Sequence, residues 1–127
     1  MAKYVYYQPN KNDTKDKYGD CVVRAITKVF DLSWEDAFMS LIPSALKIKS
    51  MPDTKEVLNE YFKEKNIKWV GCKAVKGKPR LTPKTFKEKG SYVLSLAGHI
   101  LAVENGCYYD TWDSGECCVY GYWVIKE

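Results

Sequence analysis

Apolar residues recur every three to four positions in three stretches of the first half of the chain, which predicts three amphipathic helices. The first helix follows Asp20, a residue type that caps helices, and its apolar positions are Val22, Val23, Ala25, Ile26, Val29 and Phe30. The second helix begins at Ser33 and is ended or bent by Pro43. The third helix covers residues 53–65, and Asn66 marks its stop.

Beyond residue 66, short apolar runs replace the helical spacing and predict β-strands. The expected strands are Ile67–Cys72, Tyr92–Leu96, His99–Glu104, Cys107–Trp112 and Val119–Ile125, and a short helix is expected over 82–86. Asn105-Gly106 favours a two-residue type I′ hairpin turn between the third and fourth strands. This order predicts an α+β fold in which the N-terminal helices pack on one face of a C-terminal antiparallel sheet.

Length and composition fit one domain over residues 1–127. Apolar residues make up 46% of the positions and charged residues 28%, as in ordinary globular proteins. No apolar run has the length of a membrane span, and the N-terminus lacks the apolar core of a signal peptide. We therefore expect a cytoplasmic protein without membrane contact.

The cysteines favour reduced thiols over a disulfide or zinc scaffold. There are five, at positions 21, 72, 107, 117 and 118, an odd number without regular spacing. No Cys-x-x-Cys pair accompanies the single histidine, so zinc ligands would have to converge from scattered positions. The sequence indicates no metal site and no cofactor.

Two residues have the chemistry of a nucleophile and its base. Cys21 falls in the first turn of a predicted helix, where unpaired backbone N–H groups and the helix dipole favour thiolate over thiol. His99, the only histidine, begins a predicted strand. A cysteine and a histidine brought together form the thiolate–imidazolium pair of acyl-transfer enzymes, which needs a third group to orient the imidazole.

The hairpin register supplies a candidate for that third group. With Asn105-Gly106 as the turn, Glu104 lies opposite Cys107, Leu101 opposite Asp110 and His99 opposite Trp112. Asp110 is then diagonal to His99 on the same face of the hairpin. Asp113 would point to the opposite face unless a bulge intervenes, and it is the alternative.

A cysteine at a helix start, followed by a His-led strand, a hairpin and an acidic residue two positions before a Trp, resembles the papain-like cysteine peptidases. The segments Gly19-Asp20-Cys21 and Gly98-His99, with Asp110-Thr111-Trp112, are similar to those of small papain-like proteins of bacterial and phage genomes, related to the bacteriocin-processing branch. The resemblance implies a Cys21-His99-Asp110 triad, shielded by Trp112, that acts on a peptide or protein substrate.

The resemblance also implies an amide side chain that completes the oxyanion hole shortly before the nucleophile. The family usually places a Gln about six residues upstream, and Lys15 stands there in this chain. Gln8 is the preferred substitute, with Asn10 and Asn12 as alternatives. Near the triad, Arg24 either faces the cleft to select a carboxylate or forms a structural ion pair.

Positive charge is concentrated in one segment, with ten basic and two acidic residues over 63–89. No recognised nucleic-acid motif accompanies this charge, so nucleic acid is disfavoured as a partner and a solvated face is expected. Two function classes stay open besides the hydrolase. One is an inactive papain-like binding protein, phage-encoded for instance, that engages a host protein through the basic 63–90 stretch. The other is an acyltransferase with the same triad.

Overall fold

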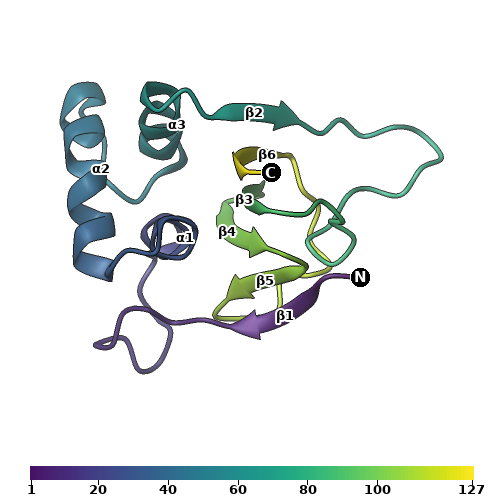
Figure 1. Ribbon diagram of the computed structural model, residues 1–127, viewed down its shortest axis with the longest axis horizontal. Coiled ribbons are helices and arrows are strands. Elements are labelled where there is room, and N and C mark those ends of the chain that lie inside the picture. Colours follow the sequence, from purple (N-terminus) through teal and green to yellow (C-terminus); the bar gives the residue numbers. More distant parts are fainter.

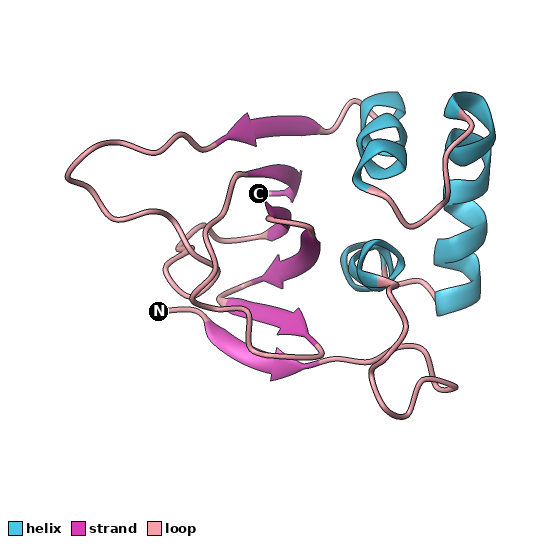
Figure 2. Cartoon of the chain, turned by 180° about the vertical axis from the view of Figure 1, so that it is seen from behind, coloured by secondary structure: helices cyan, strands magenta, loops and turns pink.

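The computed structural model describes residues 1–127, which form three helices and six strands (Figure 1). The helices are α1 (Cys21–Phe30), α2 (Trp34–Ile48) and α3 (Lys55–Glu64). The strands are β1 (Lys3–Tyr6), β2 (Lys68–Gly71), β3 (Ser91–Leu96), β4 (His99–Glu104), β5 (Cys107–Asp110) and β6 (Gly121–Lys126). The helices gather on one side of the strands, also when seen from behind in Figure 2. The α+β prediction is confirmed.

The strands form a single sheet in the order β1-β5-β4-β3-β6-β2. The β4–β5 hairpin turns at Asn105 and Gly106, both with positive φ, and Glu104 lies opposite Cys107 as predicted. One pairing differs from the expected antiparallel sheet, because β1 pairs in parallel with β5. The sequence did not predict β1, a four-residue strand at the sheet edge whose partner lies a hundred positions away.

Three local predictions need correction. Asp20 makes no side-chain cap to α1, since its carboxylate binds Arg24 and Trp34 instead. Pro43 lies inside α2, so the expectation that it ends the helix is wrong, whereas a bend stays a prediction; Leu41 and Ala45, one on each side of the proline, are buried in the core. The helix expected over 82–86 is only a turn at residues 83–85.

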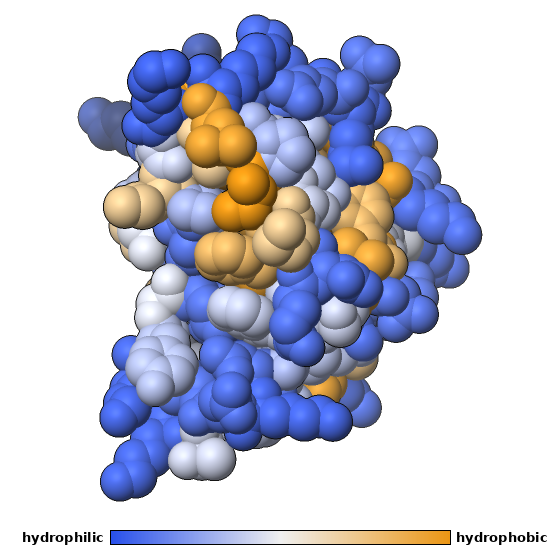
Figure 3. Space-filling view, turned by 90° about the vertical axis from the view of Figure 1, so that its left-hand side faces the viewer, coloured by the Kyte–Doolittle hydropathy of each residue, from blue (hydrophilic) through white to orange (hydrophobic).

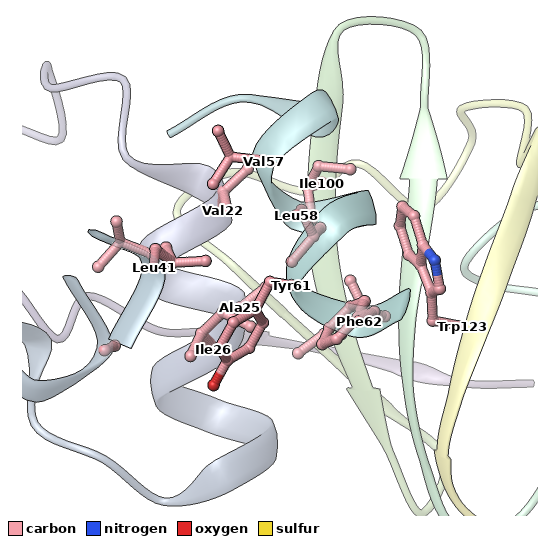
Figure 4. Close-up of a cluster of buried hydrophobic side chains, with 14 of the residues drawn as sticks. Val22, Ala25, Ile26, Leu41, Val57, Leu58, Tyr61, Phe62, Ile100 and Trp123 are labelled. Atoms are coloured by element: carbon pink, nitrogen blue, oxygen red, sulfur yellow. The ribbon is translucent and has the colours of Figure 1, made fainter. Parts of the chain in front are cut away.

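The main core lies between the helices and one face of the sheet. Figure 4 shows side chains of α1, α2 and α3, among them Ile26, Leu41 and Phe62, meeting Ile100 of β4 and Trp123 of β6. Alternate strand residues form a second apolar cluster on the opposite face, where Phe86 and Val119 from loops cover it. Both faces of the central strands are therefore buried, which fixes the position of β4 and its first residue, His99.

The outer surface on the α2 side is mostly hydrophilic, with a narrow apolar strip across it (Figure 3). None of the three helices is long and apolar enough to cross a membrane.

Candidate active site

Cys21 and His99 line one cavity, although they are far apart in the sequence. The cavity has a volume of about 270 Å³, and its wall also includes Gly19, Asp53, Lys55 and Gly98. We call this cavity the cleft. One wall comes from the start of α1 and the chain before α3, and the other comes from the turn between β3 and β4.

The start of α1 is organised by an acidic residue from another part of the chain. Asp53 Oδ1 accepts hydrogen bonds from the backbone N–H groups of Val22 (2.9 Å) and Val23 (3.1 Å). The N–H of Arg24 donates to the Asp20 carbonyl at 2.8 Å. The N–H of Cys21 has no acceptor within the protein, so one backbone donor beside the thiol stays free.

A hydrogen bond to Asp110 orients the imidazole of His99. The imidazole Nε2 lies 2.6 Å from Asp110 Oδ2, at the point where β5 ends. The regular β4–β5 ladder stops one pair earlier, at Ala102 and Tyr109, so the predicted pairing of Leu101 with Asp110 is not part of it. The two side chains meet nonetheless, because both belong to the same end of the hairpin.

The Asp110 carboxylate is fully buried and receives four hydrogen bonds. Besides His99, the donors are Arg24 Nη2 (3.1 Å), the Thr111 N–H (2.9 Å) and the Ser114 hydroxyl (2.7 Å). Every lone-pair direction of the carboxylate is thus used, and the guanidinium offsets its charge. This arrangement fixes the carboxylate and with it the ring of His99.

Arg24 takes the structural alternative of the two roles considered for it. Its side chain is buried and bridges Asp110 to Asp20, whose second oxygen accepts from the indole N–H of Trp34 at 2.9 Å. It does not line the cleft. A buried chain of polar contacts therefore runs from α2 through α1 to the hairpin and ends at His99.

The charge on His99 is stabilised by its neighbours. Burial alone would lower the pKa of His99, but the hydrogen bond to Asp110 and the interaction with the Cys21 side chain outweigh this and raise the pKa to about 9. Because Asp110 engages Nε2, the other ring nitrogen, Nδ1, is left for the thiol. At neutral pH the imidazole is protonated, as a thiolate–imidazolium pair requires.

Trp112 and Asp113 have different relations to the histidine. The Trp112 ring lies 5.0 Å from the His99 ring, centre to centre, and shields the imidazole on one side. The Asp113 carboxylate makes no hydrogen bond with His99 and accepts instead from the Tyr108 hydroxyl (2.5 Å) and the Gly115 N–H (3.0 Å). Of the two aspartates weighed as partners of His99, Asp110 alone makes the contact.

The predicted oxyanion donors do not lie at the cleft. Gln8 binds Asp16 through its amide nitrogen, and its carbonyl accepts the N–H of Asn10. The Asn10 side chain in turn accepts the N–H of Asn12. These amides stabilise the loop that precedes α1, seen below α1 in Figure 1, because each has a nearby backbone or carboxylate partner. The structure does not bring Gln8 or Asn10 to Cys21.

Two residues of the site, Asp53 and Ser114, were not predicted from the sequence. Asp53 was counted as the first residue of α3, whereas Thr54 caps that helix and Asp53 reaches across to α1. Ser114, buried and bonded to Asp110, stands in an irregular segment that follows β5. Only the Asp-x-x-x-Ser spacing near the predicted triad residue could have drawn attention to it.

Metal chemistry has no side-chain cluster to support it, since no three His, Cys, Asp or Glu side chains lie close enough together to hold an ion. Comparisons with protein-family models, with curated proteins and with solved structures found no match. Conclusions about function therefore depend on the chemistry of the cleft itself.

Proposed function

We propose that this protein is a papain-like cysteine hydrolase, a peptidase or amidase, in which Cys21, His99 and Asp110 form the triad. The observation that carries the proposal is the position of His99, which is hydrogen-bonded to a buried carboxylate and shares a cavity with a thiol at a helix N-terminus. Each part has a known role in acyl transfer: nucleophile, acid–base group and orienting group.

The reaction follows from the protonation states. The Cys21 thiolate attacks a peptide or isopeptide carbonyl and forms a carbon–sulfur bond, while the carbonyl electrons move to oxygen. Protonated His99 gives its proton to the leaving amine, and the carbon–nitrogen bond breaks to leave a thioester. His99 then takes a proton from water, which attacks the thioester and frees the acid and the thiolate. Asp110 stays ionised and orients the ring throughout.

The oxyanion is stabilised by backbone groups in this proposal. The free N–H of Cys21 is the first donor, and the exposed Gly19, which also lines the cleft and whose N–H has no acceptor, is the candidate for the second. Backbone donors cannot be removed by side-chain mutation, so this proposal predicts that Gln8→Ala and Asn10→Ala keep the full rate on a given substrate.

Residue-mapped alkylation tests the activated thiolate. We expect limiting iodoacetamide at pH 7 to modify Cys21 before Cys118, although Cys118 is the exposed thiol and Cys21 is only partly exposed. His99→Ala should remove this preference, and Cys72→Ala is the matched control that leaves it intact. Modification in the order of exposure would contradict the proposal. So would a Cys21→Ala protein that hydrolyses fluorogenic peptides as fast as the wild type.

A second candidate, a papain-like binding protein without turnover, is favoured by two observations. No amide side chain completes an oxyanion hole, and the loop between β2 and β3 projects from the domain with Lys73, Lys76 and Lys78 exposed (Figure 1). Such a loop suits an acidic protein surface. Labelling of Cys21 no faster than Cys118, together with no cleavage of any peptide in a broad library, would favour this candidate.

A further inference from the structure

Asp53 carries the one acidic side chain that lines the cleft. Its Oδ1 is occupied by the N–H groups of Val22 and Val23, but no group of the protein donates to its other oxygen, Oδ2. The only fully buried side-chain polar atom without a partner is Ser95 Oγ, so Asp53 Oδ2, which also has no partner, keeps some contact with solvent. An acceptor beside the nucleophile is thus left for a ligand.

No cation of the protein neutralises this carboxylate. Asp53 forms no ion pair, and Lys55, the other charged residue of that wall, directs its ammonium over the Trp69 ring at 5.5 Å from the ring centre. Burial raises the pKa of Asp53, the two backbone donors oppose this, and nearby Asp20 adds to the increase, while Arg24, which makes no ion pair with Asp53, lowers it slightly. A bound cation would stabilise the ionised carboxylate that burial disfavours.

The buried polar chain next to the cleft offers no surplus positive charge. The negative charges of Asp20 and Asp110 are matched by Arg24 and protonated His99. The Asp53 carboxylate, which lines the cavity together with the Cys21 side chain, is left over. The field in the cleft therefore attracts positive groups and repels negative ones.

We propose that Asp53 is a specificity-determining residue that selects substrates with a positively charged nitrogen next to the scissile bond, through a hydrogen bond and ion pair to its free oxygen. This inference rests on the proposed hydrolase function and names its substrate class. The shared chemistry is a positively charged N–H donor: a basic side chain supplies it as alkylammonium or guanidinium, and a free peptide amino terminus supplies it as alkylammonium.

Charged thiol reagents test the selection without any need for turnover. Methanethiosulfonates transfer their thioalkyl group to a thiolate and release methanesulfinate, and they exist in matched forms with a trimethylammonium or a sulfonate head. The measurement is the rate of mixed-disulfide formation at Cys21 with each reagent, mapped by mass. We expect the cationic reagent to react faster in the wild type, and Asp53→Asn to lower the ratio of the two rates by at least about fivefold.

Asp53→Asn is the first variant because an Asn oxygen still accepts the two N–H groups of α1, and Asp53→Ser is a second neutral acceptor. Asp36→Asn is the matched control, since Asp36 is an exposed acidic residue on α2 away from the cleft. We expect this control to leave the ratio within about twofold. An equal change in Asp36→Asn and Asp53→Asn, or no change in either, would overturn the inference.

Peptide substrates then distinguish the two sources of the cation. A preference for Lys over norleucine before the scissile bond, in capped peptides, assigns it to a side chain. A preference for free over acetylated amino termini, in otherwise neutral peptides, assigns it to the terminus. Cleavage with neither preference would overturn the inference while leaving the hydrolase intact. A charge-dependent reagent ratio without any cleavage would support the charge selection and contradict the hydrolase.

Discussion

The two walls of the cleft differ in how completely their polar groups are paired. One wall is formed by the turn between β3 and β4 with His99, and we call it the sheet wall; behind it, Asp110 receives four hydrogen bonds and has no accessible surface. The other wall is formed by the start of α1 and the residues around Asp53, and we call it the helix wall; there, the Cys21 N–H and Asp53 Oδ2 have no partner within the protein. Buried polar groups are normally satisfied, so open ones at a cavity are available to a ligand. The sheet wall holds His99 in one orientation, and the helix wall keeps polar groups free for a ligand.

The largest effect is expected when the Asp110 carboxylate behind the sheet wall is removed. Asp110→Ala leaves buried Arg24 with one carboxylate partner instead of two and deprives His99 of its orienting group. Because four donors, among them the buried Arg24 guanidinium and His99, lose their acceptor, we expect the free energy of unfolding to fall by about 4 kcal/mol, measured by urea denaturation.

Asp113→Asn provides the control for Asp110→Ala, since Asp113 bonds Tyr108 and not the histidine. It should leave the pKa of His99 near its wild-type value in an NMR titration, whereas Asp110→Asn should lower it. A loss of His99 protonation in Asp113→Asn but not in Asp110→Asn would reverse the roles of the two aspartates.

The second prediction concerns pH. The pKa of His99 is raised from 6.5 to about 9, so the stability contributed by its protonated form is complete below pH 6.5 and is lost as the pH rises through 9. Relative to His99→Gln, we expect the wild type to lose up to about 3 kcal/mol of unfolding free energy over this range.

Cys21→Ala separates the contribution of Cys21 to this pH dependence from that of Asp110. The variant keeps Asp110 but removes the Cys21 side chain, which also raises the pKa of His99, so its pH-dependent loss should be smaller than that of the wild type and larger than that of Asp110→Asn. An identical pH dependence in Cys21→Ala and in the wild type would show that the two walls do not interact through His99.

The contact of His99 with Asp110 at the sheet wall could be predicted from the sequence, because it depends only on residues that are close together in the chain. Asn105-Gly106 fixes the hairpin register, and alternation along two short strands then brings His99 and Asp110 to one end. The ladder is shorter than expected and β5 stops at Asp110, yet the register up to that point suffices. Signals confined to a dozen residues gave the contact correctly.

The helix wall could not be predicted, because it depends on a contact between distant segments. Asp53 caps α1 from 31 positions away, and no spacing rule links the two. The sequence instead favoured Asp20 as the cap, because it directly precedes the helix. In the structure the Asp20 carboxylate forms a buried ion pair with Arg24 and does not cap α1. Gln8 and Asn10 were favoured as oxyanion donors for their chemistry alone, without knowledge that their own loop uses them.

The third prediction measures how much Asp53 contributes to the helix wall. Asp53→Ala removes the acceptor for the Val22 and Val23 N–H groups, and loss of such a cap costs about 1 kcal/mol. Asp53→Asn should lose less, because it keeps the acceptor. Equal losses in the two variants, measured by urea denaturation, would mean that the charge rather than the hydrogen bonds stabilises α1.

The smallest effect is expected at Trp112, the outer cover of the sheet wall. Its ring centre lies 5.0 Å from that of His99, but the residue is 47% exposed, so this contact lies at the surface and is only partly shielded from water. We expect Trp112→Ala to cost about 0.5 kcal/mol in urea denaturation, and Trp112→Phe, which keeps a ring, to cost less. The hydrogen bonds of Asp110 beneath the ring hold His99 in place without the Trp112 side chain. A loss from Trp112→Ala as large as that from Asp110→Ala would mean that solvent exclusion, rather than hydrogen bonding, holds His99 in place.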